Sequence, residues 1–318
     1  MQFFTWGPGP NDQRLQPLIQ SAAKQGVAVT PIPCRSLLDK LFSLRHALAG
    51  LSASELILCS DGYDCLYLQG RLQIESIIGE FPAPIVFSAQ AEADHHLQCA
   101  VQTARSRPEA GPYPILNSGV IAGRCGDIRA MLDEICRWNL AELEQEFQTG
   151  RAGIGHFNDQ TLCGLYFARH PQQIAIDSHA KLSWTSAYEN NMVDELLAAD
   201  PFELRNPLTG LTPALFHLPC TSPGVYAQFL RTCLRLQLPL KAEQVQIVRL
   251  EQFLGERGRL REDTREVLSV FKSQPGFRST RRRQYVDHYK RRCRILLSRA
   301  LRLFIRGGTG AMTRNASR

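Results

Sequence analysis

Long apolar runs are missing from this sequence, since none approaches the roughly 18–20 residues that a membrane-spanning helix needs. The first residues, Met1–Trp6, have no basic leader, no long apolar core and no small-residue cleavage site. We therefore expect a first strand there rather than a secretion signal. No repeat of fixed period and no low-complexity linker stands out either. These absences disfavour membrane-spanning and repeat proteins.

The ten cysteines include no Cys-x-x-Cys pair. Several of them, such as Cys59, Cys136 and Cys163, fall within apolar stretches, as buried thiols do. A disulfide framework is not expected in a chain of this length without an export signal. The cysteine pattern therefore predicts a reducing compartment, a cytoplasmic location and no structural zinc.

Positive charge is concentrated near the end of the chain. Residues 278–306 contain eleven arginines and lysines against one aspartate, Asp287, while the whole chain has a net charge of +7. The remainder is slightly acidic. With 44% hydrophobic and 21% charged residues in 318, the composition is that of a globular protein with one large domain and an appendage.

Short apolar runs alternate with helical patterns as far as about residue 222. We expect strands at 3–6, 27–29, 56–59, 85–87, 115–121, 174–177 and 214–217. Helices are expected after Asn11, from about Ser36 to Gly50, and from Asp127 to Trp138. This alternation predicts an α/β, Rossmann-like fold with a mostly parallel, doubly wound sheet. Residues 223–318 are expected to be helical only, near 225–236, 242–254 and 280–305.

Two aspartates, Asp61 and Asp64, follow the apolar run Leu56–Cys59 directly. Open α/β sheets bind ligands just beyond the carboxyl ends of their strands. Two carboxylates this close need a positive charge, and a hard divalent cation carrying a diphosphate supplies it. The motif therefore predicts a sugar-nucleotide pocket. The alternative is an ordinary Asp-Gly turn.

An ordered set of short segments resembles the glycosyltransferase domain of the procollagen lysyl hydroxylases and the related collagen glucosyl- and galactosyltransferases. The resemblance covers roughly residues 1–220 and comprises Asp61-x-x-Asp64, Phe87-Ser88-Ala89, Leu116-Asn117-Ser118-Gly119, Asn158-Asp159-Gln160, Asp177 and Phe216-His217. It implies a GT-A fold and a hexosyltransferase. It also implies that Asp61, Asp64 and His217 hold Mn²⁺ against the phosphates of a UDP-sugar.

The resemblance implies further roles by position. The residues implied to bind the donor are Thr5, Lys40, Asp61, Ser118 and Gly119; those implied to lie near the reacting carbon are Asn117, Asp159 and Gln160. Two departures concern donor specificity. The chain continues after His217 with Leu218-Pro219-Cys220 in place of a glycine-asparagine-glycine run, and no tryptophan lies near residues 92–96.

Each of these residues also has a purely structural interpretation. His217 could be a core histidine, residues 117–119 a turn, Asp159 a helix cap, Asp177 a strand-end cap, and Lys40 a solvated helix residue. A separate metal site at Glu92, Asp94, His95 and His96 is not expected, because adjacent residues rarely point at one ion.

The basic residues 278–306 could pack on the first domain or lie on an anionic membrane surface, which would make the protein peripheral at the inner face of a membrane. Nucleic acid is the least favoured partner, because no recognition motif accompanies the arginines. For the chain we expect transfer of a hexose to a hydroxyl of a glycan, a lipid-linked glycan or a protein. The alternatives are an inactive nucleotide-sugar-binding relative and a metal-dependent phosphohydrolase.

Overall fold

The computed structural model describes residues 1–7, 12–91, 111–149, 157–186, 204–206, 208–219, 223–242 and 244–248. The chain divides into two compact units, one of Met1–Cys220 with Thr232–Pro239 and one of Thr221–Arg231 with Leu240–Arg318. The basic segment 278–306 and the helix expected at 280–305 lie outside the described residues. The boundary expected at about residue 222 and the all-helical extension beyond it stay predictions.

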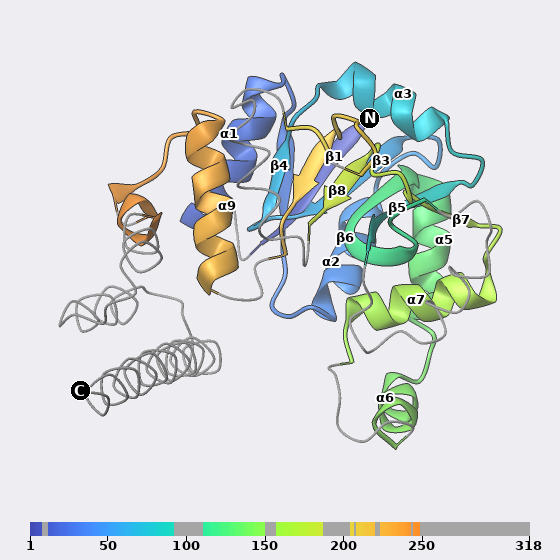
Figure 1. Cartoon of the computed structure of the whole chain (residues 1–318). Helices are drawn as coiled ribbons and strands as arrows, with labels where there is room; N and C mark the ends of the chain where they lie inside the picture. Colours follow the sequence, from blue (N-terminus) through green and yellow to red (C-terminus); the bar gives the residue numbers. More distant parts are fainter. Residues whose placement is uncertain are drawn as a thin grey trace, which may run out of the picture. The chain divides into compact units, whose positions relative to one another are not determined.

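Nine strands of the first unit form one sheet, which Figure 1 shows at the centre of that unit. They are β1 (Gln2–Gly7), β2 (Val29–Pro33), β3 (Leu56–Asp61), β4 (Cys65–Tyr67), β5 (Ile85–Gln90), β6 (Ile115–Arg124), β7 (Ile174–Ile176), β8 (Ser183–Thr185) and β9 (Leu215–His217). Their order is β2-β1-β3-β6-β5-β8-β9-β4, with β7 paired beside β5.

Five of the eight pairings between these strands are parallel. Strand β1 runs parallel to β2 and β3, β5 runs parallel to β7 and β8, and β8 runs parallel to β9. Strand β6 is antiparallel to both β3 and β5, and β4 is antiparallel to β9. The predicted α/β fold class with a mostly parallel sheet is therefore confirmed.

Helices cover both faces of the sheet. Among the described residues of the first unit, the helices are α1 (Gln16–Lys24, after a 3-10 turn at Gln13–Leu15), α2 (Asp39–Leu48), α3 (Arg71–Gly79), α5 (Cys125–Ile135), α6 (Leu140–Thr149) and α7 (Asp159–Arg169). Helix α9 (Pro223–Arg235) is divided between the two units. Apolar residues of α1 and α3 pack with Leu58 and Val86, whereas those of α2, α5 and α7 pack with Ile57 and Ile85. Neighbouring strand residues thus serve opposite cores, and each such side chain contributes about 1.5–3 kcal/mol by burial.

One end of the sheet collects the ends of many strands. Strands β1, β3, β5, β8 and β9 run in the same direction, so their carboxyl ends lie there together. Strand β6 runs the other way, and the pairing of Ser60 with Val120 brings its first residues to the same end. This carboxyl end is where the polar residues singled out in the sequence gather.

Some local predictions differ from the structure. The strand expected at 27–29 is β2, which begins at Val29, because Gly26 turns the chain with a positive φ of 68° and Val27 packs into the core. Strands β4 and β8, each of three residues, were not predicted. Helix α5 ends before Trp138. The capping residue expected at Asn11 lies outside the described part of the chain.

None of the helices in the described ranges combines the length and the apolar character that crossing a bilayer requires.

Candidate functional site

The acidic pair and the late histidine meet at the carboxyl end of the sheet. Asp61 is the last residue of β3, Asp64 follows in the bend before β4, and His217 ends β9. The Nε2 atom of His217 lies 3.8 Å from Oδ2 of Asp61 and 3.7 Å from Oδ1 of Asp64. The convergence of these three side chains, expected from the sequence, is thus present in the structure.

The bend between the two aspartates requires glycine. A Cβ atom at Gly62 would overlap the backbone oxygen of Trp6 and the Cδ2 atom of Leu15. A side chain at this position would therefore push the acidic loop away from β1.

His217 is placed by the strands on either side of it. Its register partners are Thr185 on β8 and Cys65 on β4, so these three side chains form a row across the sheet. Oγ1 of Thr185 is 3.4 Å from Nδ1 of His217. A proton on Nδ1, donated to Thr185, leaves the lone pair of Nε2 facing the carboxylates.

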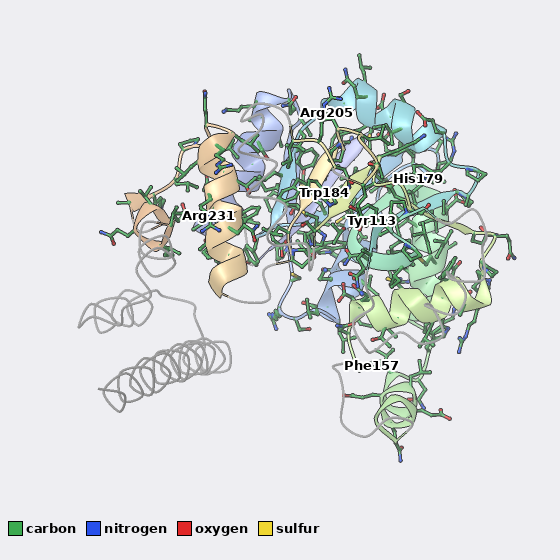
Figure 2. All side chains as sticks on the ribbon, in the orientation of Figure 1. Tyr113, Phe157, His179, Trp184, Arg205 and Arg231 are labelled. Carbon is green, nitrogen blue, oxygen red and sulfur yellow. The ribbon has the colours of Figure 1, made fainter. Side chains whose placement is uncertain are left out.

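The neighbouring residues fix this row from the opposite face of the sheet. Trp184, labelled in Figure 2, packs edge-to-face on Phe216 with ring centroids 5.2 Å apart. The backbone N–H of Leu218 also donates to the carbonyl oxygen of Asp64, at 2.9 Å. The acidic bend is therefore tied directly to the strand that carries His217.

Gly119 lies against the histidine ring. A Cβ atom here would overlap Cε1 of His217 and lie 2.7 Å from Nδ1 and 2.8 Å from Oδ1 of Asn117. The absence of a side chain at Gly119 therefore leaves the space that the imidazole of His217 occupies.

The donor atoms fit a divalent cation. The His217 side chain is 2% exposed, and its Nε2 atom makes no hydrogen bond within the described part of the chain. A buried ring nitrogen without a partner costs free energy unless a ligand satisfies it. Two carboxylates and one imidazole suit Mn²⁺, which accepts both oxygen and nitrogen. Asp64, Cys65 and His217 have possible ligand atoms within 4.8 Å of one another.

Lys40 is buried beside the acidic pair and is not the solvated residue that was one sequence interpretation. It is 4% exposed, and its Nζ atom lies 2.5 Å from Oδ1 of Asp61 and 2.8 Å from Oδ2 of Asp159. The ammonium also lies over the ring of Trp6, 4.6 Å from the centroid. Burial opposes its charge, yet Asp159 and Asp61 raise the pKa of Lys40 well above its usual value. The lysine is therefore a fixed positive charge between two carboxylates.

Burial also changes the pKa of Asp61. Removal from water raises the pKa of Asp61, the Lys40 ammonium opposes this change, and the neighbouring Asp64 carboxylate adds to it. The charged form of Asp61 is therefore not fully compensated, and a cation placed between Asp61 and Asp64 would stabilise it.

At the start of α7, one residue caps the helix and the next one contacts the site. Asn158 is the N-cap and accepts a hydrogen bond from the backbone N–H of Thr161, at 3.1 Å. Asp159, the first helical residue, instead accepts a hydrogen bond from Oγ of Ser118 at 2.9 Å and pairs with Lys40. The positive end of the helix dipole favours the Asp159 carboxylate. Asn158 therefore does the capping, and Asp159 faces the site.

Amide side chains extend the site. Nδ2 of Asn117 donates to Oε1 of Gln90 at 2.8 Å and to Oε1 of Gln160 at 3.3 Å. Oδ1 of Asn117 accepts from the N–H of Gly119 at 2.9 Å. Residues 117–119 thus belong to strand β6 and its hydrogen-bond network, and not to an isolated turn.

Thr5 lies one layer below this surface. It is fully buried, and its hydroxyl donates to the carbonyl oxygen of Ser60 at 3.0 Å. This bond joins β1 to β3 directly beside Asp61. A contact of Thr5 with a nucleotide stays a prediction.

Asp177 has the structural role expected of a strand-end aspartate. Its carboxylate accepts three backbone N–H bonds of 2.8–2.9 Å, from Lys181, Leu182 and Ser183. Burial nevertheless raises the pKa of Asp177 to about 6, against the effect of these hydrogen bonds. It holds the turn that leads into β8.

The sequence interpretation missed three residues of the site: Cys65, Thr185 and Gln90. Cys65 directly follows the acidic motif, and that proximity was the available signal. Thr185 lies on an unpredicted strand of three residues. Residues 92–96, where a separate metal cluster was considered, lie outside the described residues.

Several solved structures match this chain at low sequence identity. No protein-family model and no curated protein matches the sequence. A structure of mouse xyloside xylosyltransferase 1 in its apo form is 12% identical, covers 69% of this chain and 98% of its own, and has a TM-score of 0.41. The 4-diphosphocytidyl-2C-methyl-D-erythritol synthase of Anaerococcus prevotii is 11% identical, covering 55% of this chain and 88% of its own, with a TM-score of 0.32.

A third solved structure, A197 from STIV, is 15% identical and covers 56% of this chain and 82% of its own, with a TM-score of 0.32. The resemblance to the collagen-modifying glycosyltransferases stays a prediction.

Proposed function

We propose that this chain is a metal-dependent glycosyltransferase that moves a hexose from a UDP-sugar to an acceptor hydroxyl. The acceptor hydroxyl would belong to a glycan, a lipid-linked glycan or a protein. The observation that carries the proposal is the meeting of Asp61, Asp64 and His217 at the carboxyl end of β3, with Nε2 less than 4 Å from both carboxylates. Ligands of open α/β sheets bind at this position.

Asp61, Asp64 and His217 would hold a divalent cation, Mn²⁺ in our proposal. When bound, such an ion neutralises the charge that grows on the departing diphosphate. The three protein ligands come from the end of β3, from the bend that follows it and from β9, and hydrogen bonds join this bend and β4 to β9. The site is therefore preorganised by the strands rather than by a flexible loop.

Lys40 and Asp159 would serve the reacting end of the donor. The Asp159 carboxylate is held in place by Ser118 and Lys40. From there it orients the acceptor hydroxyl or stabilises positive charge at the anomeric carbon. Lys40 lies between Asp61 and Asp159, so it links the cation-binding carboxylate to the carboxylate near the sugar.

Asn117 and Gln160 would bind the sugar hydroxyls. Their amide groups already contact each other and have both donor and acceptor atoms, which hydroxyl groups need. Ser118 and Gly119 would shape the same pocket, and Thr5 would support it by holding β1 to β3.

A transfer assay tests the proposal. The purified protein is incubated with a panel of nucleotide sugars, Mn²⁺ and candidate acceptors, and free UDP and glycosylated product are followed. We expect metal-dependent transfer that Asp64→Ala reduces by about 100-fold or more. The matched control is Asp133→Ala, which removes an exposed carboxylate that pairs with Arg45 on the surface.

Other outcomes would contradict the proposal in distinct ways. Tight nucleotide-sugar binding without turnover would identify a binding protein. Phosphate release from simple nucleotides would identify a phosphohydrolase, in which the same carboxylates activate water. Transfer that Asp64→Ala leaves unchanged would move the active site elsewhere.

A further inference from the structure

Cys65 adds a sulfur donor to the cation site. It is the register partner of His217 across β4 and β9, and its side chain is fully buried. Its Sγ atom lies within 4.8 Å of the donor atoms of both Asp64 and His217. Cys65 also belongs to the apolar core that includes Leu58 and Val120, so it lies where that core meets the polar site.

The combination of sulfur, nitrogen and oxygen donors favours some metal ions over others. Thiolate is a soft ligand that selects zinc or cobalt, whereas carboxylate and water suit manganese and magnesium. Two ligands of a tetrahedral zinc ion with bonds near 2 Å are about 3.3 Å apart. Nε2 of His217 and Oδ1 of Asp64 are 3.7 Å apart, so only a small movement would bring both to such an ion.

A second observation points to a ligand at the same place. Nε2 of His217 is buried, is directed at the carboxylates and makes no hydrogen bond to any residue that the structure describes. Thr185 occupies the other ring nitrogen, which leaves Nε2 as the coordinating atom. A cation would satisfy this nitrogen, and the sulfur of Cys65 lies within 4.8 Å of the ligand atom of His217 as a further ligand atom.

We propose that this site binds zinc through Cys65, Asp64 and His217, with a thiolate–zinc bond that manganese would not form. Binding transfers the thiol proton to solvent and involves no change of oxidation state. Asp61 remains paired with Lys40 in this arrangement. The inference concerns the same cation position as the proposed function, but it requires no sugar transfer. It also differs from a structural zinc site, which the absence of Cys-x-x-Cys pairs argued against.

Cobalt and zinc alone test the inference. The full chain is titrated with Co²⁺ in the absence of nucleotide, and the near-ultraviolet charge-transfer band of a thiolate–cobalt bond is recorded. We expect the band in the wild type and in Cys125→Ala, a matched loss of a buried thiol on α5. We expect no band in Cys65→Ala or in His217→Ala.

Affinities provide the second measurement. Cys65→Ala is expected to weaken zinc binding by about tenfold or more, because a side chain that coordinates the metal directly is lost. The manganese affinity is expected to change by less than about threefold. Cys65→Ser keeps the side-chain size and checks the result if the alanine variant unfolds. A wild-type spectrum without the band, or equal zinc affinities in wild type and both Cys65 variants, overturns the inference.

The two proposals fail in different ways. A cobalt spectrum without a thiolate band, together with Mn²⁺-dependent transfer, removes the zinc site and leaves the glycosyltransferase. A Cys65-dependent band, together with no transfer from any nucleotide sugar, leaves the zinc site and removes the proposed function.

Discussion

The two halves of the acidic site compensate their buried charges differently. On one side Asp61 and Asp159 share the Lys40 ammonium, which lies 2.5 Å and 2.8 Å from their oxygens. On the other side His217 presents a buried Nε2 atom to Asp61 and Asp64 across 3.7–3.8 Å, too far for a hydrogen bond. In the lysine half, the ammonium of Lys40 and the carboxylates of Asp61 and Asp159 satisfy one another in ion pairs. In the histidine half, formed by His217, Asp61 and Asp64, the donor atoms are spaced so that a ligand fits between them.

The difference separates stability from ligand binding. A buried ion pair that loses one partner leaves an uncompensated charge, so the lysine half should control whether the domain folds. The histidine half should control whether a cation binds, because its atoms converge without contacting one another. Asp61 belongs to both halves, and it connects the two properties.

Removal of the Lys40 charge should have the largest effect. Lys40→Met leaves Asp61 and Asp159 without their shared counter-ion, and we expect the free energy of unfolding to fall by about 3–5 kcal/mol. Urea denaturation measures this change. Adding Asp159→Asn to Lys40→Met should recover part of the loss, since one uncompensated charge is then removed.

The control for this prediction is an exposed ion pair. Lys181→Met breaks a pair with Glu80 whose side chains are 43% and 51% exposed. It should cost no more than about 1 kcal/mol. If Lys40→Met is no more destabilising than Lys181→Met, the lysine half does not stabilise the domain and the comparison fails.

The second-largest effect is expected from a side chain at Gly119, which would disturb the histidine half of the site. Gly119→Ala places a methyl group against Cε1 and Nδ1 of His217, so the ring must move. We expect a loss of about 1–3 kcal/mol in stability from overpacking and a fall of at least about tenfold in Mn²⁺ affinity. Isothermal titration with Mn²⁺ measures the affinity.

Gly79 provides the matched glycine. A Cβ atom at Gly79 meets nothing within 4 Å, so Gly79→Ala should leave both stability and cation affinity nearly unchanged. Unchanged Mn²⁺ affinity in Gly119→Ala would show that the position of the His217 ring is not critical for binding.

Loss of the Thr185 hydroxyl should have the smallest effect of the three. Thr185→Val removes the partner of Nδ1 but keeps the shape of the side chain, and the contact is long at 3.4 Å. We expect Mn²⁺ affinity to fall by about tenfold with little change in stability. Thr185→Ser keeps the hydroxyl and should bind Mn²⁺ nearly as the wild type does. Equal affinities in the serine and valine variants would exclude a role for Thr185 in orienting the imidazole.

Much of the histidine half could be predicted from the sequence. Asp61 and Asp64 follow an apolar strand, so the rule for carboxyl ends of parallel strands predicted a ligand site there. The resemblance to the collagen-modifying glycosyltransferases supplied His217. The same alternation of strands and helices predicted the α/β class. Chemistry placed at strand ends is therefore accessible to sequence interpretation.

The lysine half was harder to predict, because its contacts depend on distant parts of the chain. Lys40 has the pattern of a surface helix residue, and contacts with β1, β3 and α7 bury it. The reversed direction of β6 was also not predicted, since an apolar run does not encode strand direction. Strands β4 and β8 were not predicted, so Cys65 and Thr185, which lie on them, were missed.

Anomalous diffraction from a crystal grown with Mn²⁺ and UDP measures the shared cation site most directly. We predict one manganese peak at about 2.0–2.3 Å from carboxylate oxygens of Asp61 and Asp64 and from Nε2 of His217, with the diphosphate on its open side. A peak bound by other residues, or UDP bound with no metal near His217, would contradict the account.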